Sequence, residues 1–304
     1  MSALGFDTSN YTTGVAVYCE KEYYNARKLL PVKEGERGLR QSDALFQHIK
    51  QLPEVIDLLD MPDDIKAVGV STRPRSVEGS YMPVFLAGLS FAKTAAKVLN
   101  VPLYEFSHQD GHIMAGIISS ESFELLEEEF ICVHLSGGTT EVVKAKYNGY
   151  NFDAEIIGGT LDISAGQVID RVGVSFGMKF PCGRELEKLA GETNKFLKLP
   201  VCVKDGYFNF SGLETKALGY RTENKAEIAG GIFHSIGETI LKSVEYSCDK
   251  FGINKVLIVG GVASNMQIRT ILNNNDRLKF YFATPELSSD NACGIAALAY
   301  KARR

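Results

Sequence analysis

The sequence lacks any apolar stretch long enough to span a lipid bilayer. Its first residues, Met1 to Asp7, also lack the basic region and apolar run of a secretory signal peptide. No part of the chain is of low complexity, and no segment has the composition of a linker. We therefore expect a cytoplasmic protein with no membrane association.

Closely spaced cysteines are also missing. The six cysteines are scattered, none belongs to a CxxC pair, and four lie in apolar runs that are typical of strands or helices. Buried, reduced thiols are therefore the expected state of these residues.

The chain has no excess of positive charge. Lys and Arg number 33 against 37 Asp and Glu, which gives a net charge of −4. Phosphate contacts need clustered Lys and Arg, so this composition argues against a domain that holds nucleic acid by bulk electrostatics alone. An RNA substrate would need a local basic patch or a partner protein.

A strand–turn–strand pattern occurs twice in the 304 residues. Leu4–Ser9 and Thr13–Tyr18 form the first copy, and the second runs from Ile131 to Val143 through a turn of Ser, Gly and Thr. Such weak self-similarity predicts a duplicated α/β lobe, and the length also favours two domains.

Hydrophobic periodicity predicts the remaining elements. An almost wholly apolar strand breaks into Gly260 and Gly261, as a buried parallel strand does where it meets a ligand. The other expected elements are helices over 42–59, 83–99 and 226–250, helices beginning near 165, 184, 264 and 290, and strands near 67–71, 154–157 and 280–283.

Small polar residues occupy both strand–turn–strand tips. Asp7-Thr8-Ser9 and Ser136–Thr140 would let backbone N–H groups approach an anion, although such residues also simply make turns. A nucleotide held between two lobes needs one such tip from each lobe, and Gly260–Asn265 would join the two tips at the cleft. We therefore predict a nucleotide-binding protein and treat Asp7, Thr8 and Ser9 as a possible phosphate loop.

His108 and His112 have the spacing of two metal ligands on one helical face, which suits Zn²⁺ or Fe²⁺. A bare HxxxH is more often a pair of surface or capping residues, so a third ligand is required. Asp290 is a candidate, and its other possible role is the N-cap of the last helix.

Asp170 could accept hydrogen bonds from a ribose or be a solvated helix carboxylate. The alternating pattern of Phe208–Leu213 suits an edge strand, and the spacing of these residues predicts no chemical role.

Nearly end to end, these motifs resemble the tRNA threonylcarbamoyladenosine transferases, the family of bacterial TsaD, once described as O-sialoglycoprotein endopeptidases. The family's His-Met-Glu-Gly-His matches His108–His112, and its Thr-Asp-Asn matches Ser289–Asn291. The resemblance implies His108, His112 and Asp290 as ligands of one divalent metal, Fe²⁺ or Zn²⁺.

The same resemblance implies an adenylate site. The family's Ser-Gly-Gly-His-Thr, Phe-Asp-Lys, Pro-Gly-Gly and Gly-Gly-Val-Ser-Ala-Asn match segments that begin at residues 136, 169, 181 and 260. The residues implied to hold threonylcarbamoyl-AMP, AMP or ATP are His134, Leu135, Ser136, Gly137, Gly138, Asp170, Gly183 and Asn265.

The fold that this resemblance implies is the actin-like ATPase fold (ASKHA, ribonuclease H-like), a duplicated two-lobe α/β architecture with a nucleotide cleft between the lobes. We expect an N-terminal lobe over 1–126 and a C-terminal lobe over 127–304. The last helix, about 290–304, is expected to pack back on the N-terminal lobe.

Several positions depart from the family's motifs. Asn10, Tyr11 and Thr12 replace Cys-Asp and an acidic residue in the first loop, and Arg73-Pro74-Arg75 replaces Gly-Pro-Gly. In the signature Phe-Ser-Phe-Ser-Gly-Leu-Lys-Thr, matched by Phe208–Thr215, Glu214 replaces the lysine. These changes are compatible with a divergent paralogue that has an altered substrate or no turnover.

The activity implied by the resemblance is transfer of a threonylcarbamoyl group from threonylcarbamoyl-AMP to the N6 amine of the adenosine next to the tRNA anticodon. Implied partners are tRNA and TsaB-like and TsaE-like subunits, or a second copy in a homodimer. Two alternatives stay open: a non-catalytic nucleotide-binding partner subunit, and a carbamoyltransferase or kinase of the same fold acting on a small molecule. No general base is evident, and a zinc peptidase is disfavoured because no glutamate separates the two histidines.

Overall fold

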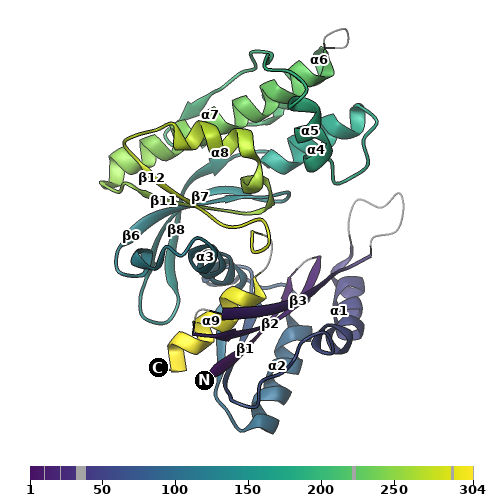
Figure 1. The fold of residues 1–304 in the computed structure, drawn as a ribbon, viewed down its shortest axis with the longest axis vertical. Coiled ribbons are helices and arrows are strands. Elements are labelled where there is room, and N and C mark those ends of the chain that lie inside the picture. Colours follow the sequence, from purple (N-terminus) through teal and green to yellow (C-terminus); the bar gives the residue numbers. More distant parts are fainter. Residues whose placement is uncertain (10, 21, 32–38, 221–223, 289–290, 304) are drawn as a thin grey trace. The chain divides into compact units, whose positions relative to one another are not determined.

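The computed structural model describes residues 1–9, 11–20, 22–31, 39–220, 224–288 and 291–303. Its contacts divide the chain into two compact units (Figure 1). The first unit comprises the described parts of Met1–Phe123, Tyr147–Asp153 and Ser289–Arg304, and the second comprises those of Glu124–Lys146 and Ala154–Ser288.

The first unit is built on a mixed five-stranded sheet. Its strands lie in the order β3 (Glu22–Leu29), β2 (Thr12–Cys19), β1 (Ser2–Ser9), β4 (Ile65–Arg73) and β5 (Leu103–Ser107). β1 and β2 pair antiparallel, with Ser2 opposite Cys19 and Ser9 opposite Thr12, which confirms the first predicted hairpin. β4 runs parallel to both β1 and β5.

Helices cover this sheet, because all eight residues of β1 are buried and both of its faces must therefore be packed. α1 (Gln41–Ile56) and α2 (Phe85–Leu99) contact each other and the strands β2, β1 and β4. α9 (Ala292–Arg303) contacts β1, β2, β4 and α3 (His108–Ser119), as Figure 1 shows within this unit.

The packing of α9 on α3 depends on a glycine. A side-chain carbon added to Gly294 would lie only 1.9 Å from the backbone oxygen of Gly111, so no other residue fits without moving a helix. The last helix of the chain therefore lies directly against the helix that carries the predicted metal ligands.

The second unit contains a seven-stranded sheet. The strand order is β12 (Lys279–Phe282), β11 (Lys255–Val259), β6 (Glu129–Leu135), β7 (Thr140–Tyr147), β8 (Phe152–Thr160), β10 (Tyr207–Phe208) and β9 (Val203–Lys204). β6 and β7 pair antiparallel, which confirms the second predicted hairpin, and β11 runs parallel to β6 and β12.

The longest helix of the described residues, α7 (Lys225–Phe251), forms much of the core of this unit together with β6 and β11. Four shorter helices accompany it: α4 (Ala165–Ser175), α5 (Gly183–Ala190), α6 (Ser211–Gly219) and α8 (Met266–Asn273). Two 3₁₀ turns, η1 (Phe123–Leu126) and η2 (Gly261–Ser264), complete the described elements.

Several described elements were not predicted from the sequence, among them β3, β5, α6 and the short strand β9. The edge-strand interpretation of Phe208–Leu213 is wrong beyond Phe208, because β10 ends there and α6 begins at Ser211. The expectation that the cysteines are buried is wrong for Cys202, which is exposed beside the short edge strand β9, and Cys19 is half-buried. No helix within the described ranges combines the length and apolarity needed to cross a membrane.

Candidate functional site

His108 is the first residue of α3, and a capping box fixes the start of this helix. The hydroxyl of Ser107 accepts a hydrogen bond from the Asp110 backbone N–H (3.1 Å), and the Asp110 carboxylate accepts one from the Ser107 N–H (2.9 Å). His112 follows one turn later, and the two imidazole centroids are 4.6 Å apart. The structure therefore confirms that both histidines lie on one helical face.

A buried carboxylate lies behind His108. Both carboxylate oxygens of Asp7, at the end of β1, are 3.1 Å from His108 Nδ1, and Ser71 donates a hydrogen bond to one of them. Burial by itself raises the pKa of Asp7, but the charge of His108 and the hydrogen bonds from His108, Ser71 and Asn291 outweigh it and lower this pKa. Asp7 thus stays ionised and can hold the proton of His108 on Nδ1.

This arrangement fits a divalent metal at Nε2 of His108. A metal-bound imidazole commonly donates its other N–H to a carboxylate, as His108 can donate to Asp7. Asn291, which follows Asp290 in the sequence, has its Nδ2 3.4 Å from Asp7 Oδ2 and from His108 Nε2. Asp290 itself lies outside the described residues, and within those that are described no three His, Cys, Asp or Glu side chains form a metal-binding group.

Thr8 and Ser9, the other residues of the possible phosphate loop, are buried in the first unit. The Thr8 hydroxyl donates to the Val84 carbonyl (3.0 Å) and accepts from the Gly88 N–H (3.1 Å). These bonds attach the end of β1 to the start of α2, so the Thr8 side chain is engaged within the unit.

In the second unit, the start of α4 holds the turn that follows β6. His134 and Leu135 end β6, and the Ser136 N–H then donates to the Thr139 carbonyl (2.9 Å). Ser164, the N-cap of α4, donates its hydroxyl to the Gly137 carbonyl (2.6 Å). A side-chain carbon at Gly137 or Gly138 would meet no atom within 4 Å, so this turn presents backbone to open space.

Asp170 and Gly183 lie next to each other, because Asp170 on α4 accepts a hydrogen bond from the Cys182 N–H (2.8 Å). Burial raises the pKa of Asp170, and this hydrogen bond opposes the rise. Gly183 begins α5, and a side-chain carbon there would also meet nothing within 4 Å.

Asn265 lies near α5, because the next residue in the chain is hydrogen-bonded to this helix. Its Oδ1 caps α8 by accepting from the Ile268 N–H (3.0 Å), while its buried Nδ2 has no acceptor among the described residues. The next residue, Met266, donates its N–H to the Glu187 carboxylate of α5 (2.8 Å). Through α5, the structure brings Asp170, Gly183 and Asn265 into one region of the second unit.

An arginine on α8 is hydrogen-bonded to the backbone of the segment that leads to Asn265. Arg269 donates from Nε to the Ala263 carbonyl (2.8 Å) and from Nη2 to the Ala283 carbonyl (2.7 Å). Arg269 and Glu187 were not predicted from the sequence, since neither has a local pattern. The capping box formed by Ser164 and Gln167 was also missed, although this pattern is a local signal.

Solved structures define the class of fold. HypF of T. kodakarensis matches with a TM-score of 0.64 at 14% identity, over 99% of this chain and 48% of that one, so this chain spans about half the length of HypF. A ROK family glucokinase from Streptomyces griseus matches with a TM-score of 0.57 at 10% identity, over 99% of this chain and 100% of that one. The architecture is the actin-like ATPase fold, as expected from the sequence.

Sequence relatives define the family. The family model described as "TsaD: tRNA N6-adenosine threonylcarbamoyltransferase" matches residues 38–297. The chain is 30% identical to a tRNA N6-adenosine threonylcarbamoyltransferase of Sulfurihydrogenibium sp. (strain YO3AOP1), over 99% of this chain and 90% of that one. It is 34% identical to one of Clostridium perfringens (strain SM101 / Type A), over 78% and 71%. The chain therefore belongs to the TsaD family, which is a family of transferases.

Proposed function

We propose that this chain modifies tRNA by transferring a threonylcarbamoyl group from threonylcarbamoyl-AMP to the N6 amine of the adenosine next to the anticodon. The amine nitrogen forms a bond to the carbamoyl carbon, the bond from that carbon to the AMP phosphate oxygen breaks, and the amine loses one proton. Family membership supports the class of reaction.

The observation that carries the adenylate half of the proposal is the open backbone region of the second unit. The Gly137–Gly138 turn would cradle the phosphate with N–H groups, and Asp170 would accept hydrogen bonds from the ribose hydroxyls. The buried Nδ2 of Asn265, which lacks an acceptor in the described residues, would donate to the ligand. His134, Leu135, Ser136 and Gly183 complete this proposed site.

For the first unit we propose a divalent metal, Fe²⁺ or Zn²⁺, on His108, His112 and Asp290. When bound there, the metal would act as a Lewis acid and stabilise negative charge on an oxygen ligand. The contribution of the chain is to hold the first imidazole by its Nδ1–H on Asp7, which leaves Nε2 as the ligand atom.

One observation favours a second candidate, a paralogue with an altered substrate or no turnover. Where the family motifs have two lysines, this chain has Arg171 and Glu214, and Arg171 Nη1 lies 3.2 Å from Glu214 Oε2. The two motif lysines are thus replaced by an arginine and a glutamate that pair with each other, so these two positions carry no net positive charge. A partner subunit that binds an adenylate without transferring it, or an enzyme acting on a small molecule, would tolerate this loss of charge.

The deciding experiment incubates the purified chain with threonylcarbamoyl-AMP and unmodified tRNA, with and without candidate TsaB-like and TsaE-like partners, and analyses tRNA nucleosides by mass spectrometry. We expect threonylcarbamoyladenosine and AMP in equal amounts. Binding of AMP without product in every combination would favour the non-catalytic paralogue, and turnover of a metabolite without tRNA would favour the small-molecule enzyme.

The metal is tested separately by elemental analysis. We expect about one metal ion per chain and a large loss of metal in His108→Ala. His234→Ala, which removes a histidine of the second unit, is the matched control and should retain the metal. Full occupancy in His108→Ala would show that this histidine is not a ligand.

A further inference from the structure

A groove of about 830 Å³ lies at the β9–β10 edge of the second unit and contains no residue of the proposed adenylate site. Its walls come from the end of β8, the β9–β10 hairpin and the start of α6. Its lining includes Leu161, Pro200, Lys204, Tyr207, Asn209 and Ser211. This volume falls in the range of pockets that hold one nucleotide-sized ligand.

The walls of the groove are fixed by internal hydrogen bonds. The Asp162 carboxylate accepts from the backbone N–H groups of Phe210 (2.8 Å) and Ser211 (3.0 Å), which joins the end of β8 to the start of α6. The Gly206 carbonyl at the hairpin tip accepts from the Gly159 N–H (3.1 Å) and the Ser243 hydroxyl (2.6 Å). A ligand would therefore enter a preformed site at a low ordering cost.

The groove lies close to the Gly137–Gly138 turn. Asp162 in its wall precedes Ser164 by two residues, and Ser164 donates its hydroxyl to the Gly137 carbonyl (2.6 Å). Two residues span at most about 7 Å. A ligand at the Asp162 end of the groove would thus lie near the turn proposed to cradle the adenylate phosphate, within the same unit.

The lining suits a nucleobase better than a phosphate. Leu161, which is 67% exposed, and Pro200 offer apolar surface against which a base can pack, while Tyr207, Asn209 and Ser211 offer hydrogen-bonding groups. Lys204, the one cation among the described residues of the lining, is accompanied by the carboxylates of Asp162 and Asp205, so a free anion gains little there.

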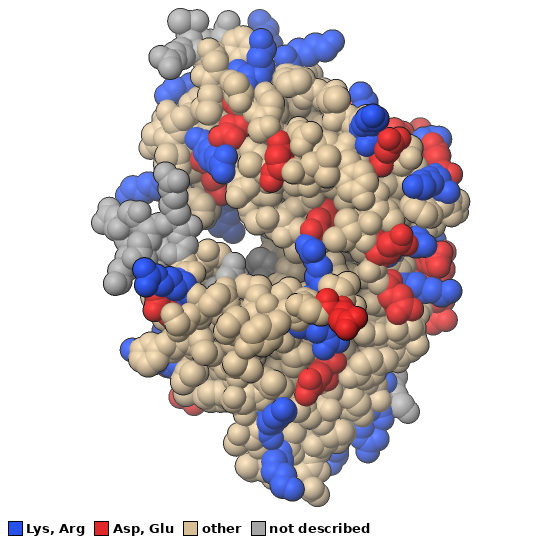
Figure 2. All heavy atoms as spheres, turned by 180° about the vertical axis from the view of Figure 1, so that it is seen from behind, with Lys and Arg blue, Asp and Glu red and all other residues tan. Residues whose placement is uncertain are grey.

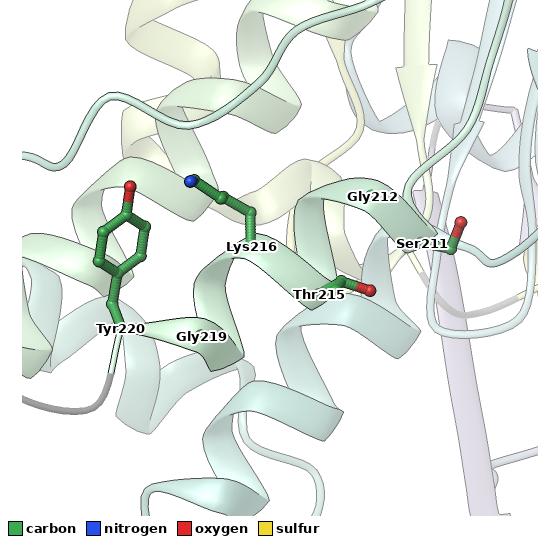
Figure 3. Close-up of a pocket in the computed structure, with 6 residues that line it drawn as sticks. All are labelled: Ser211, Gly212, Thr215, Lys216, Gly219 and Tyr220. Atoms are coloured by element: carbon green, nitrogen blue, oxygen red, sulfur yellow. The ribbon is translucent and has the colours of Figure 1, made fainter.

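A second, smaller hollow of about 450 Å³ continues along α6 and shares Ser211 and Gly212 with the groove (Figure 3). Lys216 and Tyr220 line its far end, and the Lys216 ammonium lies 5.2 Å from the Tyr220 ring centroid. A single small molecule needs one such hollow, whereas a polymer strand can fill both. The ammonium of Lys216 is placed for a phosphate that flanks a base in the groove.

Figure 2 shows Lys and Arg interspersed with Asp and Glu on the visible face, so charge alone does not mark an RNA path there. In the groove, where Lys204 is accompanied by Asp162 and Asp205, recognition would come from local shape and hydrogen bonding, as it does for unstacked bases of single-stranded RNA.

We propose that the groove holds the unstacked acceptor adenosine of the RNA, with the flanking backbone phosphate at Lys216. This inference rests on the proposed function and adds to it a binding site for the acceptor. An acceptor held there would lie next to the proposed adenylate turn, which is what transfer to an amine requires.

Cys202 provides a direct test, because it lines the groove and is the one exposed cysteine of the six. The rate of alkylation of Cys202 by iodoacetamide is measured by mass spectrometry of the full chain, alone, with AMP, and with an unmodified anticodon stem-loop RNA. We expect the RNA to slow alkylation about tenfold and AMP to leave the rate unchanged.

Matched variants locate the contact. Asn209→Ala and Lys216→Ala should each weaken RNA binding about tenfold in fluorescence anisotropy, and Lys216→Ala should also reduce its salt dependence. Asn254→Ala and Lys242→Ala, exposed residues of the same unit outside both hollows, should bind RNA like the parent chain. All four should keep the parent affinity for AMP.

The outcomes separate the two proposals. RNA that binds without protecting Cys202, equal binding by all four variants, or no RNA binding by the chain would each overturn the groove assignment. Protection of Cys202 together with the loss in the two groove variants would support it even if no product formed, in which case the proposed transfer alone would fail.

Discussion

The two units solve the problem of building a site in different ways. In the first unit, side chains more than a hundred positions apart meet in the interior, where Asp7 contacts His108 and Asn291. In the second, the exposed element is the backbone at Gly137 and Gly138, and the Ser164 hydroxyl holds this turn. Glu187 and Arg269 hold the neighbouring backbone of Met266 and Ala263. The first site therefore depends on charge and protonation, and the second on close packing.

One methyl group added to α4 should disrupt its packing against the Gly137–Gly138 turn of the second unit. A side-chain carbon at Gly166 would lie 2.4 Å from the Gly137 Cα, so Gly166→Ala must push α4 away from the turn. We expect a loss of about 3 kcal/mol in the free energy of unfolding, measured by urea denaturation, together with loss of AMP binding in calorimetry.

Gly183→Ala is the matched control, because the added carbon meets no protein atom within 4 Å. It should keep or slightly raise stability while weakening AMP binding, since Gly183 belongs to the proposed adenylate site. A Gly166→Ala chain as stable as the parent would contradict the close contact between α4 and the turn.

Mild acid should damage the first unit before the second. His48 is fully buried, its Nδ1 lies 2.8 Å from the Thr13 hydroxyl, and burial lowers its pKa to about 4. An unfolded histidine titrates near 6.5, so the unfolded state binds more protons below that pH, and stability falls between about pH 6.5 and pH 4 by up to about 3 kcal/mol.

In the second unit, Asp162 gains hydrogen bonds that outweigh its burial and hold its pKa at about 2, below this window. Hydrogen exchange followed by mass spectrometry should therefore show loss of protection in α1 and β2 at a higher pH than in α6. His48→Gln should remove most of the acid sensitivity of the first unit. Simultaneous loss of protection in both units would contradict the comparison.

Removing the charge behind His108 should weaken metal binding without changing the ligands. Asp7→Asn keeps the size of the side chain but no longer offers a carboxylate to Nδ1. We expect the metal affinity, measured by competition with a chelator, to fall about tenfold to hundredfold. Asp64→Asn, at a half-buried carboxylate that pairs with the Met1 amine, should have no effect, and equal affinities in both variants would exclude Asp7 as a positioning residue.

The smallest effect is expected from replacing Arg269, which is hydrogen-bonded to the Gly260–Asn265 segment. Arg269→Met would leave the carbonyls of Ala263 and Ala283 without their guanidinium donor, which should cost about 1–2 kcal/mol in the free energy of unfolding. AMP binding should weaken as well because Asn265 is less well held. Unchanged AMP affinity in a destabilised variant would show that Arg269 serves stability alone.

Local patterns predicted those parts of the fold that have a strong local signal. The two hairpins and the histidine pair were readable because alternation and i, i+4 spacing are short-range features. β3 was missed because seven of its eight residues are exposed or half-buried, so its sequence shows no apolar face. α6 was missed because the alternating Phe208–Phe210 segment precedes it and suggests a strand.

The site was only partly readable for a different reason. Spacing could propose His108 and His112, but the contact between Asp7 and His108 joins positions 101 residues apart. Glu187 and Arg269 act through backbone groups, and any acidic or basic residue on an exposed helix face has the same local sequence signal. Such contacts follow from tertiary packing, which one sequence does not display.

The contact between α9 and β1 has a consequence for synthesis of the protein. Among the described elements, β1 is synthesised before all the others, but one of its faces is covered by α9, which is synthesised after all the others. Every described residue of the second unit has been synthesised before α9, so that unit can complete its core while the first still exposes apolar strand surface. Nascent chains therefore carry an open sheet until α9 has been made, and in that period chaperone binding, or a stop codon before α9, would affect the first unit most.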